Sequence, residues 1–226
     1  MKKSMRGACF GTQHLLNKEL HRSGHKDKFF RMYNLENLLP FIKEIDKLKF
    51  IERQALCHNG QRRENTAEHS WHLAMTVIVF HSLVEKEVDL AKAVKMALLH
   101  DLVEIDAGDT FVYADLSGKK EKETQAINRL TALLPEPLDA EFKSLWLEFE
   151  EGVSAEAKFV GAIDRFLPLY SNFLNDGYSW KNHDVTEKKV YGRVEKPISE
   201  GFPPLWLIAK KMIEDSVKKS WIRTES

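Results

Sequence analysis

The most constraining feature of this sequence lies in residues 95–109, where a histidine and several acidic residues interrupt an apolar segment. The segment begins as a helix rich in Leu and Ala, and His100, Asp101 and Glu104 follow in close succession. This spacing predicts that the three side chains share one face of a single helix. Buried charges are costly unless they are paired or bind a metal. The pattern therefore indicates either an ordinary solvent-facing stripe or a cluster that binds a cation.

Length and composition are those of an ordinary globular protein. The 226 residues suffice for one domain with a full core, and 43% of them are hydrophobic. The 34 basic and 34 acidic residues balance, so no net charge attracts nucleic acid. No apolar run is long enough for a membrane span, and the basic N-terminus lacks the apolar part of a secretory signal. Because two cysteines give no disulfide framework, we expect a cytoplasmic protein that binds neither nucleic acid nor membranes.

Apolar periodicity predicts helices along most of the chain. Residues 1–33 are polar and basic, and we expect them to form a mobile extension ahead of a domain at residues 34–220. Within that domain, helices are predicted at residues 35–50, 66–85, 90–107, 119–134, 138–150, 155–174 and 205–220. Residues 51–65 and 175–204 are expected to be irregular, and no strand is predicted. The expected fold is an all-α, single-domain helical bundle.

Two helix starts position further candidate residues. Asn65 begins a sequence close to a capping box, so His69 should lie in the rigid first turn of the following helix. Ser154 is expected to cap another helix, in which Asp164 lies on or beside the apolar stripe. A carboxylate at such a position needs a partner. The neighbouring Arg165 is expected to point elsewhere, about 100° around the helix axis.

Arginines are concentrated just before the first of these helix starts. They are Arg53, Arg62 and Arg63. A guanidinium group binds phosphate oxygens in a two-pronged manner, although loop arginines are more often simply solvated. Their position next to a capped helix makes these three candidates for holding a phosphate group.

The predicted helices can bring together two imidazoles and two carboxylates, from His69, His100, Asp101 and Asp164. Without cysteine, this mixed nitrogen and oxygen set suits one divalent metal such as Mn, Fe, Co, Ni or Zn. Such a metal lowers the pKa of bound water and stabilises charge on a phosphoryl oxygen. Glu104 lies one turn along from these ligands, where it could take or give a proton.

The order of these four residues resembles the H…HD…D signature of the HD-domain metal-dependent phosphohydrolases. Within that family, residues 63–71, 100–104, 107–109, 145–151 and 155–164 resemble the branch that contains bacterial 5′-deoxynucleotidases. The resemblance covers about residues 34–215. It implies an α-helical bundle that binds the metal through the four residues, with Glu104 and Asp109 near the scissile phosphate. It also implies a homodimer.

The segment that contains Arg53 matches the deoxynucleotidase branch at one position and differs from it at the next. An Arg-Trp pair contacts the substrate in the deoxynucleotidases. Arg53 matches the arginine of that pair, but Gln54 stands where the tryptophan would be. The resemblance therefore implies hydrolysis without implying a preference for deoxyribose.

The prediction is a divalent-metal-dependent phosphohydrolase whose substrate is a small phosphate ester, namely a (deoxy)nucleoside 5′-monophosphate. One alternative is hydrolysis of another nucleotide or small phosphate ester. Another is a metal-bound module that senses nucleotides without turnover, although such a module would not need Glu104 and Asp109. A plain helical interaction protein is a further alternative, and it would purify without stoichiometric metal.

Overall fold

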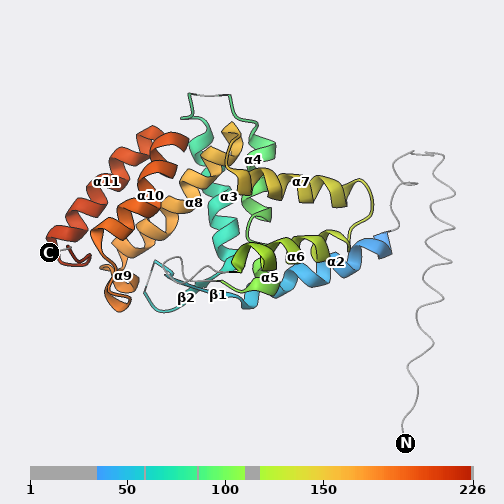
Figure 1. Cartoon of the computed structure of the whole chain (residues 1–226), viewed down its shortest axis with the longest axis horizontal. Coiled ribbons are helices and arrows are strands. Elements are labelled where there is room, and N and C mark those ends of the chain that lie inside the picture. The colour runs from blue at the N-terminus through green and yellow to red at the C-terminus, as the bar shows by residue number, and fades with distance from the viewer. Residues whose placement is uncertain (1–34, 59, 86, 110–117, 225–226) are drawn as a thin grey trace, which may run out of the picture. The chain divides into compact units, whose positions relative to one another are not determined.

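The computed structural model describes residues 35–58, 60–85, 87–109 and 118–224. It confirms a predominantly α-helical domain (Figure 1). The predicted extension at residues 1–33 lies outside the described residues. The described helices that match predicted ones are α3 (Thr66–His81), α6 (Lys119–Thr131), α7 (Leu138–Glu151), α8 (Ala155–Leu174) and α11 (Pro203–Lys218). None of the helices in the described part of the chain has the length and apolarity needed to cross a membrane.

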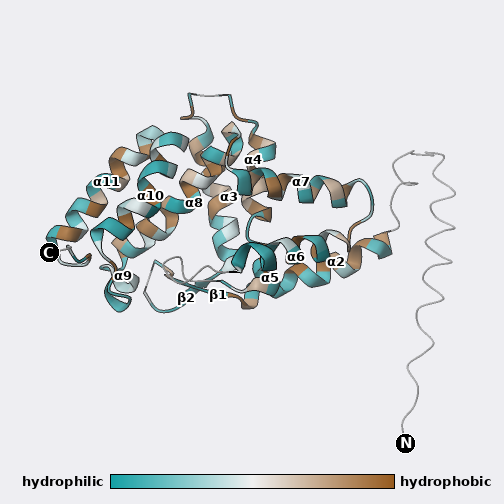
Figure 2. Cartoon of the chain, viewed as in Figure 1, coloured by the Kyte–Doolittle hydropathy of each residue, from teal (hydrophilic) through white to brown (hydrophobic). Residues whose placement is uncertain are grey.

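Helix α8 is the central element of the fold. It packs against α3, α4 (Leu90–Leu99), α7, α10 (Glu187–Gly201) and α11. Phe159, Val160 and Ile163 of α8 are almost completely buried, in a core to which all these helices contribute. Each such side chain stabilises the fold by roughly 1.5–3 kcal/mol. Figure 2 shows apolar and polar residues mixed along α10 and α11, as expected for helices with one buried and one exposed side.

A short hairpin replaces the irregular segment predicted before α3. Strand β1 (Glu52–Leu56) pairs in antiparallel fashion with β2 (Arg63–Asn65). The prediction that the chain has no strand was therefore wrong. Long-range contacts hold the hairpin, since Ala55 is buried and the Ser171 hydroxyl on α8 donates to the Leu56 carbonyl at 2.7 Å. Such contacts leave no period in the local sequence.

The predicted first helix is divided into three short pieces. They are the 3-10 helix η2 (Leu35–Leu38), the α-helix α2 (Leu39–Ile45) and the 3-10 helix η3 (Asp46–Phe50). Pro40 lies at the start of α2, where its missing N–H is tolerated. Apolar steps of three and four residues do not distinguish a 3-10 helix from an α-helix.

The central helix also ends earlier than predicted. Helix α4 stops at Leu99, a turn follows, and the short α5 begins at Glu104 (Glu104–Ala107). The expectation of one continuous helical face was therefore wrong. In a regular helix the His100 carbonyl would accept the Glu104 N–H, but here the Trp146 indole donates to it at 3.2 Å. The Glu104 N–H bonds the Asp101 carbonyl instead, which tightens the turn.

Residues 175–204 are largely helical, contrary to the prediction. They contain α9 (Tyr178–Asn182) and all of α10, whose N-cap is Thr186. Buried Val190, Val194 and Ile198 recur at every fourth position of α10, so a helical signal was present. Gly192 and Pro197 masked that signal in the sequence.

Candidate active site

A capping box at the start of α3 fixes His69. The Asn65 side chain accepts the Glu68 N–H at 3.0 Å, and the Glu68 carboxylate accepts the Asn65 N–H at 3.1 Å. This confirms the predicted helix start, and a cap of this kind contributes about 1 kcal/mol. His69 follows within the first turn, and its side chain is only 1% exposed. The imidazole is therefore held rigidly inside the protein.

The structure brings the four predicted ligands together from three parts of the chain. His69 Nε2 lies 2.9 Å from Asp164 Oδ1, and His100 Nε2 lies 3.6 Å from the same oxygen. Asp101 Oδ2 lies 3.0 Å from His100 Nε2. One ligand atom each from His69, His100 and Asp101 lie within 4.8 Å of one another. We call these four residues the His-Asp cluster.

The protonation pattern of His100 fits a bound cation. Its Nδ1 faces the Ala97 carbonyl at 3.0 Å, so Nδ1 carries a hydrogen and Nε2 is the nitrogen that faces the carboxylates. Within the described part of the chain, Nε2 is buried and forms no hydrogen bond, because the nearby Asp101 oxygen does not meet it in bonding geometry. An imidazole nitrogen and carboxylates that face one another need a proton or a metal ion between them. The donor set therefore fits a divalent cation.

Electrostatics within the cluster favour the same conclusion. Burial opposes a charge on His100, but the carboxylates of Asp101 and Asp164 raise its pKa to about 10 when no metal is bound. Burial also opposes a charge on Asp164, but Arg165 and the two imidazoles hold its pKa well below the usual range. The Asp101 pKa is likewise lowered, since His100 and Arg53 outweigh the effect of burial. Both aspartates are therefore ionised and can act only as acceptors.

Arg165 was expected to point away from Asp164, but it turns toward this residue. Its Nη1 contacts Asp164 Oδ2, which leaves Oδ1 facing the two imidazoles. The prediction was wrong because the rotation between neighbouring helix positions describes only where a side chain begins. The long arginine side chain turns back toward its neighbour.

Arg53 on β1 lies inside the site and neutralises carboxylates. Its Nη1 is 2.8 Å from Asp101 and 3.7 Å from Glu104, and its Nε is 3.9 Å from Glu64. Burial alone would lower the pKa of Arg53, but the carboxylates of Asp101, Glu104, Asp109 and Asp164 raise it above its usual value. Arg53 is therefore a permanent cation within an acidic group of side chains.

Glu104 and Asp109 have the properties of proton-transfer groups. Glu104 Oε2 accepts a hydrogen bond from the Thr66 hydroxyl at 2.7 Å. Burial and the charge of Asp101 raise the Glu104 pKa to about 8 in the metal-free protein, although Arg53 opposes the shift. Burial also raises the Asp109 pKa. A carboxyl that exchanges its proton near neutral pH suits general acid–base chemistry.

The other two predicted arginines are not brought to this site. Arg62 binds both oxygens of the Glu68 carboxylate at 2.8 and 2.7 Å, on the outside of the capping box. Arg63 is exposed at the start of β2. Of the three predicted phosphate-binding arginines, only Arg53 lies beside the His-Asp cluster, because the hairpin turns the other two outward.

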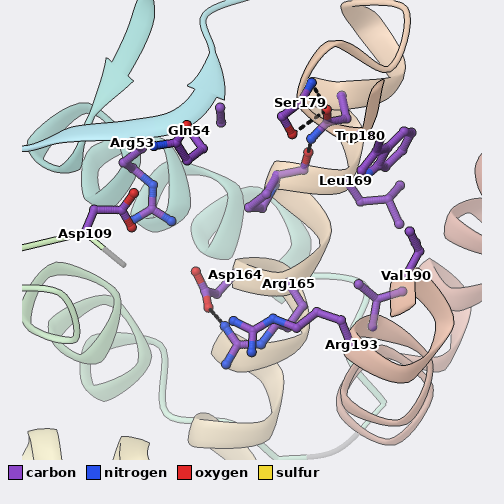
Figure 3. A pocket seen from close by; sticks show the side chains of 14 residues that line it. Arg53, Gln54, Asp109, Asp164, Arg165, Leu169, Ser179, Trp180, Val190 and Arg193 are labelled. Carbon is purple, nitrogen blue, oxygen red and sulfur yellow. Dashed lines mark hydrogen bonds and ion pairs between the residues drawn. The ribbon is translucent and has the colours of Figure 1, made fainter. Parts of the chain in front are cut away.

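A pocket opens beside the cluster (Figure 3). It encloses about 720 Å³, counting the space that is open to solvent. Asp109, Asp164 and Arg53 line it together with Arg165 and Arg193. Much of the rest is apolar and comes from Leu169, Trp180, Val190 and Val194. Sequence reasoning missed Arg193 because its helix, α10, was expected to be irregular.

The metal-free protein should lose stability as the pH rises through the range in which Glu104 ionises. In the unfolded chain this carboxyl ionises near pH 4.5, whereas the folded chain keeps its proton up to about pH 8. Between these values the folded state binds more protons, so the free energy of unfolding falls with rising pH. Unfolding temperatures of EDTA-treated protein across this range would test the prediction. The Glu104→Gln variant should show a smaller decrease, and an equal decrease in both proteins would contradict it.

Comparison with known families decides the identity of the domain. The HD domain family matches residues 45–206. The chain belongs to this family. The predicted resemblance is thereby confirmed, and the His-Asp cluster occupies the interior of an HD domain.

Several relatives of this HD-domain protein carry functional names. The 5′-deoxynucleotidase HDDC2 of Homo sapiens is 34% identical over 140 residues, which cover 60% of this chain and 67% of the human protein. The Bos taurus protein of the same name is 35% identical, and the match covers 57% of this chain and 63% of the relative. The 5′-deoxynucleotidase hdd1 of Schizosaccharomyces pombe is 27% identical, and the match covers 82% of this chain and 87% of the yeast protein. The chain thus spans about two thirds of the animal relatives and most of the yeast one.

A solved structure supports the fold of the whole domain. The crystal structure of a predicted metal-dependent phosphohydrolase from Magnetospirillum magnetotacticum superposes with a TM-score of 0.79 and is 40% identical. The match covers 83% of this chain and 95% of that chain. The expected HD-type helical bundle is thereby confirmed.

Proposed function

We propose that this HD-domain protein is a divalent-metal-dependent phosphohydrolase that hydrolyses (deoxy)nucleoside 5′-monophosphates. The main support is the buried His-Asp cluster, in which His100 Nε2 faces the carboxylates of Asp101 and Asp164 beside an open pocket. Relatives named 5′-deoxynucleotidase and a structural neighbour named a metal-dependent phosphohydrolase support the reaction class.

The metal would be held by His69, His100, Asp101 and Asp164. A divalent cation supplies a Lewis acid that lowers the pKa of a water molecule and neutralises charge on the phosphate. Mn, Co, Ni, Fe and Zn all suit this ligand set. Arg53 limits the repulsion between the surrounding carboxylates, because it contacts Asp101 at 2.8 Å.

We assign the proton transfers to Glu104 and the orientation of the attacking water to Asp109. Thr66 holds Glu104 Oε2, so Oε1 is the oxygen that takes a proton from the attacking water. As the water oxygen bonds to phosphorus, the bond from phosphorus to the nucleoside oxygen breaks. The leaving oxygen then receives a proton from protonated Glu104. The products are inorganic phosphate and a nucleoside.

A phosphate-release assay tests the proposal. Substrates would include ribonucleotides, deoxyribonucleotides and generic phosphomonoesters, each with EDTA or with added Mn, Co, Ni, Mg or Zn. We expect metal-dependent release from nucleoside monophosphates and its loss in Asp101→Ala. The sugar preference would reveal the effect of Gln54. Metal-containing protein that releases phosphate from no substrate would reject turnover and favour a sensing role.

We also propose that the protein is a homodimer. On α3, Trp71, Met75 and Ile78 follow one another at helical spacing with 64%, 43% and 43% exposure. Such an apolar stripe favours contact with another protein surface. Light scattering coupled to gel filtration would measure the mass, and Trp71→Glu should reduce it to that of a monomer. A monomeric wild type would reject the dimer.

The location and extent of the functional unit are further proposals. We propose a cytoplasmic enzyme, since a chain with two cysteines has no disulfide framework. We place the catalytic domain at residues 34–220, after an N-terminal segment at residues 1–33. Cell fractionation would test the first proposal. Limited proteolysis followed by mass spectrometry would test the second.

A further inference from the structure

Arg193 lies on the side of α10 that packs against α8. The neighbouring Val190 and Val194 are buried, and all three residues line the pocket. By contrast, the Lys196 side chain on the same helix is 82% exposed. A guanidinium group that lines a pocket presents a planar set of N–H donors, whose geometry matches the oxygens of an anion.

Arg165 approaches the same pocket from α8. Its Nη1 contacts Asp164 Oδ2, and this contact occupies one of the five N–H donors of the guanidinium group. The side chain is one-third exposed and lines the pocket. Figure 3 shows Arg165 and Arg193 extending from two different helices toward Asp164. Arg165 thus links the His-Asp cluster to the pocket.

Arg53 is poorly placed to supply the positive charge for a substrate. It is surrounded by Asp101, Glu104 and Glu64 at distances of 2.8–3.9 Å. Its charge is therefore largely balanced within the protein. Arg165 faces one carboxylate, that of Asp164, and it lines the pocket together with Arg193.

We propose that Arg165 and Arg193 form an anion-binding arm that holds the phosphate dianion of the substrate against the His-Asp cluster. This inference rests on the proposed phosphohydrolase function. The planar guanidinium groups match the oxygens of a phosphate, and a cation bound by Asp164 would leave Arg165 with excess positive charge. Arg165 also positions Asp164, because it binds one oxygen of that carboxylate while the other faces the imidazoles.

Binding of inorganic phosphate to the full chain tests this arm separately from turnover. Calorimetric titrations would use both metal-loaded and EDTA-treated protein. Arg193→Gln should weaken phosphate binding about 10-fold or more, as expected for the loss of a charge-assisted hydrogen bond. Bound metal and the unfolding temperature should stay at wild-type values. Lys196→Gln removes a positive charge from the same helix without altering the pocket, and it should leave phosphate affinity unchanged.

Arg165→Gln should weaken phosphate binding even in EDTA-treated protein, and it should also lower metal affinity through Asp164. Equal phosphate affinity in wild type and Arg193→Gln would reject the proposed anion-binding arm. An equal loss of phosphate affinity in Lys196→Gln would also reject it. If Arg193→Gln folds poorly, Arg193→Lys can replace it, because lysine keeps the positive charge but cannot bind two phosphate oxygens through a planar guanidinium group. Unchanged phosphate affinity in Arg193→Lys would reject bidentate binding by Arg193. Wild type that binds phosphate through both arginines but hydrolyses no ester would reject the proposed function and retain the arm.

Discussion

Replacing Glu104 by Gln should lower kcat about 100-fold or more while the protein still binds its metal. Glutamine keeps the size of the side chain and can still accept the Thr66 hydrogen bond, which measures 2.7 Å in the wild type. It cannot accept a proton from water, so the chemical step loses its base. Metal content by elemental analysis, together with steady-state kinetics on a nucleoside monophosphate, would measure the two effects separately.

Asp106 provides a matched control on the same short helix. It is also a carboxylate, but it binds Arg129 at 2.6 and 2.8 Å and lies outside the His-Asp cluster. Asp106→Asn should therefore leave kcat almost unchanged. If Glu104→Gln retained both its metal and full turnover, the role of Glu104 as the base would be wrong. If Asp106→Asn were equally inactive, the loss would reflect damage to α5.

Replacing Gly201 by Ala should destabilise the domain by about 3 kcal/mol or more. Gly201 ends α10 where this helix approaches α8, and an added Cβ would lie 2.1 Å from the Lys158 carbonyl oxygen and 2.8 Å from the Ala162 Cβ. Because these are backbone and core atoms, the two helices must move apart. For a domain of this size, such a loss lowers the unfolding temperature by about 6–12 °C. Differential scanning calorimetry would measure the change.

Gly192 is the matched control within α10. An added Cβ would meet no atom within 4 Å there, and the position is exposed. Since Ala favours a helix over Gly by roughly 1 kcal/mol, Gly192→Ala should raise the unfolding temperature. A Gly201→Ala protein as stable as the wild type would show that α8 and α10 do not approach as closely as described.

The sequence alone determined those features whose causes are local. Asn65, Asp89 and Ser154 each accept a backbone N–H within the first turn of the helix that follows, so their residue types were sufficient to locate α3, α4 and α8. The residue types of the His-Asp cluster were likewise sufficient to predict a binding site. Two imidazoles and two carboxylates within apolar helices need a common partner, wherever the helices lie.

Tertiary structure alone decided how these residues meet. The Trp146 indole donates a hydrogen bond to the His100 carbonyl, at the end of α4. The residue spacing within residues 95–109 could not predict this contact. Pairing of β1 with β2 turns Arg62 outward and places Arg53 inside, and the packing of α10 on α8 brings Arg193 to the pocket. Each outcome depends on contacts between residues far apart in the chain. The free energy of those contacts overrides local preference, so periodicity located most helices but could not predict how they surround the site.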